Sequence, residues 1–479
     1  MFGRNTFWLW LDMGALRIGN LLAGFFLIRY FGPHNFGLYS TAIAVGFIVN
    51  ALCDLGLTRY TGRAVAADRR EAGPILAVTF LSTGLLAVLG LSALLIVLAG
   101  GYSAAAVVLA GVMLNNFEGS ATLCSAMLTA NLRPRQILPG SALSASCLVT
   151  MATLVIFLHW SVLTFVLLGI VRSFSVFMVR LWQLRDFWPS ASVWQRDLLL
   201  RTVRSAWPFF TYNITQVGYG RISIVCFSLV APQALVGIYS AAFVLSDVFP
   251  QWSYSASGSL LPLWTRLYEG GRKRELVETR ESLLDVIVLL CVPIAITLSV
   301  FAPEICAFLG SRFADSAPVL RIIAYRELLS VVDGVLGHGF LIAVNQVRQR
   351  QRAQLTALGM LAVLTLAFGR LWGPPGVGIA LLIADAFLVL RYLGILASLD
   401  LHIRTRFVLP VFFAGTCMAV AALATPFGRY GSVARLVAGL VTYSAILSLF
   451  SRHQLAGVFR TLAHCARGLM PSHSAEVAQ

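Results

Sequence analysis

The sequence carries very little charge. Only 12% of its 479 residues are charged and 58% are hydrophobic, whereas soluble globular domains carry about 25% charged residues. Runs of about 20 apolar residues recur from end to end, and each is long enough to cross a bilayer as a helix. The lack of charge therefore excludes an ordinary soluble domain and predicts an all-α polytopic membrane protein.

Acidic residues are scarcer than basic ones, at 20 against 36, which gives a net charge of +16. In a soluble protein this excess would suggest nucleic-acid binding, but here the distribution explains it. If the N-terminus is cytoplasmic, the opposite side of the membrane holds only Arg312, Arg370, Arg429 and Arg435. This asymmetry follows the positive-inside rule, so we expect both termini in the cytoplasm and no nucleic-acid partner.

Patterned cysteines and catalytic motifs are also missing. The eight cysteines are scattered singly, which argues against a disulfide framework or a zinc site. No HExxH, GxSxG, P-loop or DxD-type motif occurs in the predicted cytoplasmic loops. The longest outer loop expected has about ten residues, too short for the catalytic apparatus of a membrane-embedded polymerase or ligase. We expect no enzyme, no cofactor and no metal site.

The apolar runs are continuous, which favours helices over alternating strands. The first run carries Asp12 and Arg17 and lacks a small-residue cleavage site, so it is not read as a cleavable signal peptide. We predict about 14 transmembrane helices, over residues 7–31, 36–57, 75–99, 103–130, 138–158, 163–184, 205–230, 236–262, 283–309, 319–345, 354–372, 377–398, 407–425 and 433–451.

One phrase occurs twice, as "RYFGPHNFGLYSTA" from Arg29 and as "VAPQALVGIYSAA" from Val230. Six predicted helices lie between the copies, so both copies have the same orientation and indicate a parallel pseudo-two-fold repeat. We expect the Gly-Pro stretch to be a tight outer turn between the first two helices. The predicted parts are an N-lobe of six helices (1–190), an amphipathic linker (191–204), a C-lobe of six helices (205–400), two extra helices (401–451) and a cytoplasmic tail (452–479).

Charged residues within the spans are candidates for function. A charge at the bilayer centre costs about 2.5–3.5 kcal/mol even on a lenient scale, so it must face water or pair with another charge. Arg17 and Arg221 each lie in the first helix of a lobe, and a gap between lobes would bring both to one cavity. Arginine suits phosphate because its planar guanidinium can donate two parallel hydrogen bonds.

Other candidates have structural alternatives that stay open. Arg29 lies near a span end and could reach the interface. Arg326 and Asp333 are seven residues apart and share a helix face, either in a cavity or as a buried structural pair. The candidate substrate-binding residues are Arg17, Arg221, Arg172, Arg326, Arg29, Asn213 and Gln216, and the candidate ion-coupling residues are Asp247, Asp12, Asp385 and Glu118. Packing or helix-end roles, or hydrogen bonding between helices for Glu118, are the alternatives for the second group.

The opening "RYFGPHNFGLYS", the following "DLGLTRYTGR" from Asp54 and the later "VGIYSAAFVL" from Val236 resemble the polysaccharide transporter family. These Wzx-type flippases belong to the superfamily that also contains multidrug extruders and the lipid II flippase. The second copy has no arginine at the position of Arg29, so Arg29 need not be half of a symmetric pair.

The resemblance implies a bacterial inner-membrane flippase that moves an undecaprenyl-pyrophosphate-linked oligosaccharide, an O-antigen or exopolysaccharide unit, to the outer leaflet. Alternating access of two lobes around a cationic cavity, coupled to an ion gradient, is the implied mechanism. Its partners would be the lipid-linked oligosaccharide and the lipid bilayer, with polysaccharide polymerase and chain-length machinery as further candidates. A multidrug or organic-cation antiporter and a lipid II flippase are the alternatives.

Overall fold

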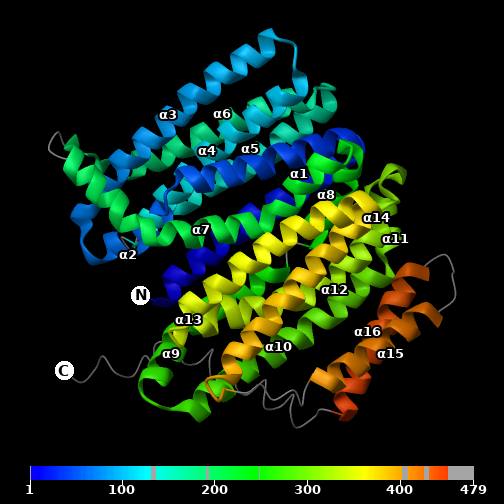
Figure 1. Ribbon diagram of the computed structural model, residues 1–479. Coiled ribbons are helices and arrows are strands. Elements are labelled where there is room, and N and C mark those ends of the chain that lie inside the picture. Colours follow the sequence, from blue (N-terminus) through cyan, green and yellow to red (C-terminus); the bar gives the residue numbers. More distant parts are fainter. Residues whose placement is uncertain are drawn as a thin grey trace. The chain divides into compact units, whose positions relative to one another are not determined.

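The computed structural model describes residues 2–130, 136–189, 194–246, 249–401, 408–424 and 431–450, so the predicted tail at 452–479 lies outside the described residues. The described residues form helices joined by short turns and contain no strand (Figure 1). The main helices are α1 (Phe2–Cys53), α2 (Leu57–Ala67), α3 (Ala72–Ala99), α4 (Ser103–Ala130), α5 (Ile137–Phe157), α6 (Val162–Gln183), α7 (Arg196–Val230), α8 (Gln233–Ser246), α9 (Phe249–Glu269), α10 (Lys273–Val300), α11 (Ala302–Leu309), α12 (Ser316–Val335), α13 (Leu341–Ala343), α14 (Val347–Ala397), α15 (Val408–Ala424) and α16 (Gly431–Phe450).

The chain divides into two compact units, Met1–Ser240 and Ala241–Gln479. By this division α7 and the first half of α8 belong to the first unit. Residues 196–204, expected in an amphipathic linker, form the first turns of α7 and continue in one helix to Val230. Residues 191–193 of that linker lie outside the described residues. The division into two six-helix repeats stays a prediction.

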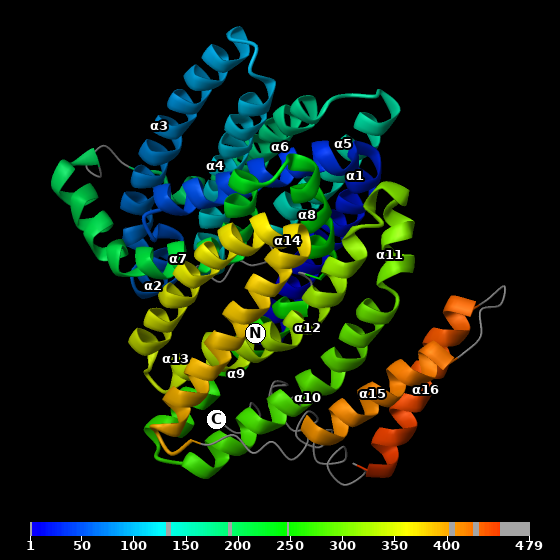
Figure 2. The same ribbon diagram turned by 45° about the vertical axis from the view of Figure 1, so that its right-hand side comes forward.

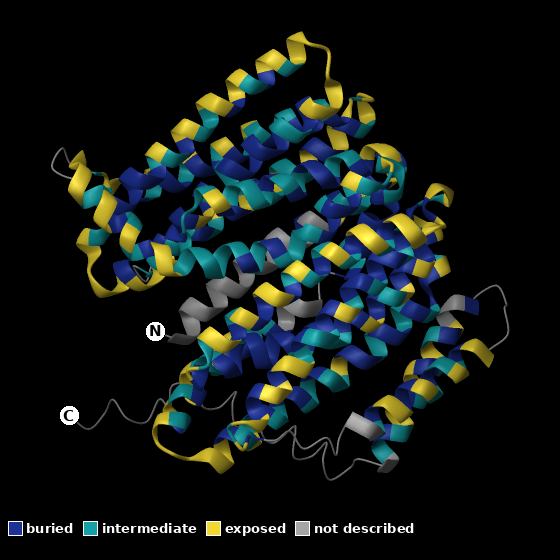
Figure 3. Ribbon diagram, viewed as in Figure 1, coloured by how far each residue is buried: buried dark blue, intermediate teal, exposed yellow. Residues whose placement is uncertain are grey.

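The helices have the length and surface of membrane spans. Seven of them, including α3 to α6, are long and apolar enough to cross a bilayer, whereas α8, α15 and α16 are apolar but shorter in their described parts. One face of α3 exposes large apolar side chains, and much of this helix is exposed in Figure 3. A large exposed apolar face is unfavourable in water and favourable in contact with lipid chains. The protein is therefore a multi-pass helical membrane protein, and the count of 14 spans stays a prediction.

The Gly-Pro turn near residue 32 is much shorter than expected. The chain is helical on both sides of it, and only Gly32, with φ of 69°, leaves the helical region inside α1. Glycine tolerates a positive φ without steric cost, and Pro33 favours the start of a helix. The predicted turn is therefore a break at one residue, and "NFGLYSTA" is helical. Gly373, with φ of 63° before two prolines, makes the same kind of break in α14.

The two copies of the repeated phrase meet inside the first unit. A Cβ added at Gly37 of α1 would lie 2.8 Å from the backbone nitrogen of Gly237 and 1.8 Å from the carbonyl oxygen of Gln233 on α8. Thr41 donates a hydrogen bond of 3.0 Å to the side chain of Gln233. Only glycine permits this backbone approach, so both glycines of the phrase are required by one helix contact.

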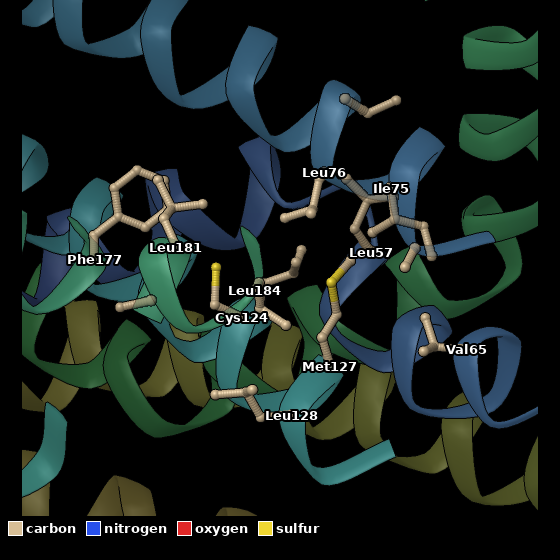
Figure 4. Close-up of a cluster of buried hydrophobic side chains, with 14 of the residues drawn as sticks. Leu57, Val65, Ile75, Leu76, Cys124, Met127, Leu128, Phe177, Leu181 and Leu184 are labelled. Atoms are coloured by element: carbon tan, nitrogen blue, oxygen red, sulfur yellow. The ribbon is translucent and has the colours of Figure 1, made fainter. Parts of the chain in front are cut away.

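An apolar cluster joins α2, α3, α4 and α6 at one end of the first unit (Figure 4). Its buried members include Leu57, Leu76, Met127 and Leu181. In the second unit, α15 and α16 pack on α10 through a separate cluster, as the paired helices in Figure 2 indicate. Tyr443 of α16 donates a hydrogen bond of 2.8 Å to the carbonyl of Leu289. The first cluster includes residues of α6, which carries Arg172, and Leu328 of α12, which carries Arg326, packs against the second.

Candidate functional site

Arg172 on α6 is held by one carboxylate and by hydroxyl groups. It donates to Ser144 on α5 at 2.6 Å and forms a 3.3 Å salt bridge with Glu118 on α4. The Arg172 side chain is only 8% exposed, whereas the Glu118 side chain is 43% exposed. Screening weakens a salt bridge that opens on one side, so the carboxylate cancels only part of the charge on Arg172.

Arg221 on α7 lies over an aromatic ring instead of an acid. Its guanidinium carbon is 4.7 Å from the ring centroid of Phe47 on α1, an attractive cation–π contact. Among the described residues no salt bridge involves Arg221. Tyr39 of α1 is within electrostatic range of Arg172, Glu118 and Arg221. The first unit therefore places two arginines near one stretch of α1, and within the described residues only Arg172 has an acidic partner.

Asn213 and Gln216 lie one to two turns before Arg221 on α7, and both are half-buried. Asn213 donates a hydrogen bond of 3.1 Å to Asp54 at the end of α1, so its amide already has a partner. Asp54 occurs in "DLGLTRYTGR" and was not among the predicted site residues. Its position beside a helix break is the signal that identifies it.

Arg326 on α12 lies inside a closed ionic network of the second unit. It donates to Glu327 at 2.8 Å and forms a salt bridge with Asp385 on α14. All three residues are buried. Two carboxylates on one guanidinium leave Arg326 less suited to an additional anion than Arg221.

The network continues to Asp333 and His338, five residues apart. A π-helical turn, Leu336–Phe340, follows α12, and it places Nδ1 of His338 3.6 Å from the carboxylate of Asp333. The imidazole packs against Tyr254 of α9, with 4.2 Å between ring centroids. Such turns inside helices are frequent at functional sites. Sequence reasoning missed His338 because an α-helix would put positions 333 and 338 on different faces.

Acidic and basic groups from several helices gather in this network. Asp333 is buried within electrostatic range of Arg350, Arg326 and Asp385. With Glu327, the described cluster contains three carboxylates and two guanidinium groups beside His338. Ionisable residues gathered inside a membrane protein are candidates for proton or ion binding.

Three predicted site residues lie where no side chain is described. The side chains of Asp12 and Arg17 on α1 and the whole of Asp247 are outside the described residues. Arg29 is exposed, three residues before the break at Gly32. Within the described residues, no group of three or more His, Cys, Asp or Glu side chains could hold a metal ion.

Buried charges within a bundle of apolar helices define the class: a multi-pass membrane protein with polar sites inside each unit. The family model of the polysaccharide biosynthesis proteins matches residues 2–268, more than half of the chain. The chain belongs to this family.

Solved structures share its fold at low sequence identity. The lipid II flippase MurJ, in an inward closed conformation, has 12% identity and a TM-score of 0.71, over 95% of this chain and 99% of that one. An inward-facing MATE-family multidrug transporter of the MOP superfamily has 13% identity and a TM-score of 0.61, over 80% and 95%. A MATE transporter from Vibrio cholerae has 16% identity and a TM-score of 0.51, over 84% and 97%. No curated protein matches the chain in sequence.

Proposed function

We propose that this chain is a flippase, not an enzyme, which moves an undecaprenyl-pyrophosphate-linked oligosaccharide from the cytoplasmic to the outer leaflet. The family membership and the fold shared with a lipid II flippase support the class. The observation that carries the substrate is Arg221, a guanidinium within a predicted span that contacts a ring and no described carboxylate. The chain would lie in a bacterial inner membrane with both termini cytoplasmic.

The chemistry of the substrate explains the need for such arginines. A pyrophosphate is charged and cannot cross hydrocarbon unaided, whereas a polyprenyl tail can stay in the lipid. Arginine stays protonated and its planar group can hold phosphate oxygens through two hydrogen bonds. Arg221 and Arg172, with Arg17 as a further candidate, would neutralise the headgroup while the glycan passes through water. Too many arginines would prevent release.

The driving force would come from an ion gradient, and the buried network around Asp333 and Asp385 is the proposed coupling site. Binding of a proton to one of these carboxylates would change the charge of the cluster and favour one conformation of the protein. Glu118, Asp12 and Asp247 remain candidates for the same role. Polysaccharide polymerase and chain-length machinery are candidate partners, because they would act on the exported unit.

The experiment that tests the function is deletion of the gene, followed by identification of the lipid-linked glycan that accumulates on the inner leaflet. We expect an oligosaccharide repeat unit on a polyprenyl pyrophosphate, and restoration of export by the wild-type gene. Accumulation of lipid II would identify the chain as a lipid II flippase instead. Normal glycan export with increased sensitivity to organic cations would indicate a drug antiporter.

A further inference from the structure

A small polar cavity lies inside the first unit, and neither Arg172 nor Arg221 lines it. It has a volume of ≈ 10 Å³ and is lined by side chains of α1, α3 and α4 and by the break between α1 and α2, including Asn50, Asp54, Thr79, Thr83 and Asn116. About 10–15 Å³ holds one water-sized particle. Two of its lining residues, Leu57 and Leu123, also belong to the apolar cluster, and Leu57 is labelled in Figure 4.

The hydroxyl groups that line the cavity direct their hydrogen atoms to other oxygen atoms of the protein, which leaves their lone pairs as acceptors. The hydroxyl groups of Thr79, Ser82 and Ser120 donate to backbone carbonyls of their own helices, at 2.8, 3.2 and 2.9 Å. Because Ser120 donates to a carbonyl, the 2.6 Å contact between Thr83 and Ser120 makes Thr83 the donor. Asn116 turns its amide nitrogen to the carbonyl of Thr83 at 3.0 Å, which leaves its oxygen as an acceptor. Such acceptor oxygens can bind either a donor such as water or a small cation that prefers oxygen ligands.

Asp54 supplies a negative charge at this cavity, and no salt bridge within the described part of the chain cancels it. Its carboxylate accepts hydrogen bonds from the backbone and hydroxyl of Thr58 and from Asn213, all neutral donors. Among the described residues no basic group lies within salt-bridge distance of it, and Arg59 acts on it only from farther away. A small cation bound in the cavity would neutralise the charge of the Asp54 carboxylate.

The backbone at this place has the form expected of a cation site. Helix α1 ends at Cys53, and the next turn contains Leu55 with φ of 51° and Gly56 with φ of 82°. A positive φ at a leucine is strained and is often associated with function. The carboxyl end of a helix carries partial negative charge, and interrupted membrane helices use such ends to hold Na⁺.

We propose that this cavity is a binding site for one small monovalent cation, with Na⁺ as the best fit. Asp54 provides the single negative charge, and Asn50, Thr83 and Asn116 provide neutral oxygens. A divalent ion would need more carboxylates or more space. Because Asp54 also accepts a hydrogen bond from Asn213, the ion would stabilise the contact between the end of α1 and α7. The site goes beyond the proposed flippase function and can be tested without transport.

The test is Na⁺ binding to the purified full-length protein, measured with radioactive Na⁺ and as a rise in melting temperature when Na⁺ replaces choline at constant ionic strength. The wild type is expected to bind Na⁺ with saturation and to bind K⁺, the larger ion, more weakly. Asp54→Asn is expected to weaken Na⁺ binding at least about tenfold, or ~1.4 kcal/mol. Asparagine keeps a side-chain oxygen that can accept from the backbone and hydroxyl of Thr58, so this variant removes the charge with little change to the first turn of α2.

Two further variants separate binding from folding. Asp68→Asn changes another capping carboxylate, which is exposed and accepts from the backbone of Arg70 at 2.9 Å, and should leave Na⁺ binding unchanged. Thr83→Val keeps the shape of the side chain but removes one cavity oxygen, and should weaken Na⁺ binding. Equal binding by wild type, Asp54→Asn and Thr83→Val would overturn the proposal. A cavity that holds only water would show no Na⁺ dependence in any of the proteins, with the same consequence.

Discussion

Arg221 in the first unit and Arg326 in the second are both buried or half-buried arginines of a membrane protein, but their surroundings differ. Within the described residues Arg221 lies against Phe47 and pairs with no acid, whereas Arg326 contacts two carboxylates, Glu327 and Asp385. Arg172 is intermediate, because its described carboxylate partner is half-exposed. The difference means that the position of an arginine in a predicted span does not reveal whether its charge is paired. We infer that a substrate-binding arginine is one whose charge is not already cancelled.

The largest effect is expected from Arg326→Ala. The change leaves Glu327 and Asp385 buried without their guanidinium, and breaking a buried ion pair costs about 3–5 kcal/mol. The free energy of unfolding of the purified protein should fall by that order in denaturant unfolding. Arg272→Ala, at an exposed pair, is the matched control and should not change it. Unchanged unfolding of Arg326→Ala would show that Arg326 is not structural.

Arg221→Ala should act on binding instead of stability. Loss of charge-assisted hydrogen bonds, worth about 1.5–3 kcal/mol, would weaken binding of a polyprenyl pyrophosphate by about 10–100-fold in a titration of purified protein. The unfolding curve should stay close to that of the wild type. Arg370→Ala, an exposed arginine on α14, serves as control. Wild-type affinity in Arg221→Ala would remove this residue from the site.

Asp333→Asn tests whether the buried ionic network of the second unit couples transport to a proton gradient. It removes one of the three described carboxylates of the buried cluster, and with it a group that can take up the coupled proton. Transport by the variant should then lose its response to an imposed pH difference across the vesicle membrane. Asp315→Asn, an exposed position at the start of α12, should keep the response. An identical response in Asp333→Asn and wild type would place the coupling elsewhere.

Glu118→Gln should give the smallest effect. It removes the partly exposed partner of Arg172 and leaves the hydrogen bond to Ser144. A partly exposed salt bridge is worth about 0–1 kcal/mol, so the affinity for a polyprenyl pyrophosphate should rise by at most about fivefold. A large loss of affinity would mean that Glu118 itself contacts the substrate.

The sequence predicts much of the fold, because long apolar runs and glycine–proline pairs act locally. Membrane helices and the breaks at Gly32 and Gly373 are readable from such patterns. The contact between Gly37 and Gly237 could not be predicted in this way, because the repeat marks equivalent positions and does not indicate which of them are in contact.

The candidate site is harder to predict from the sequence, because its contacts join residues that are distant along the chain. Asn213 and Asp54 are 159 residues apart in sequence, and only packing of α7 on the end of α1 pairs them. Asp333 and His338 meet because the helix widens into a π-turn, whereas 100° per residue in an α-helix would place them about 140° apart. Charge type could be predicted, but the partners that cancel each charge could not.

The most direct test of the central claim is translocation of a polyprenyl-pyrophosphate-linked oligosaccharide by protein reconstituted in liposomes, with Arg221→Ala, Arg221→Lys and wild type compared at equal amounts of folded protein. If Arg221 holds the pyrophosphate, the wild type should translocate the substrate and Arg221→Ala should lose about 10–100-fold of the rate. Arg221→Lys should keep partial activity, because lysine keeps the charge but lacks the planar guanidinium group. Equal translocation by all three proteins would contradict this claim.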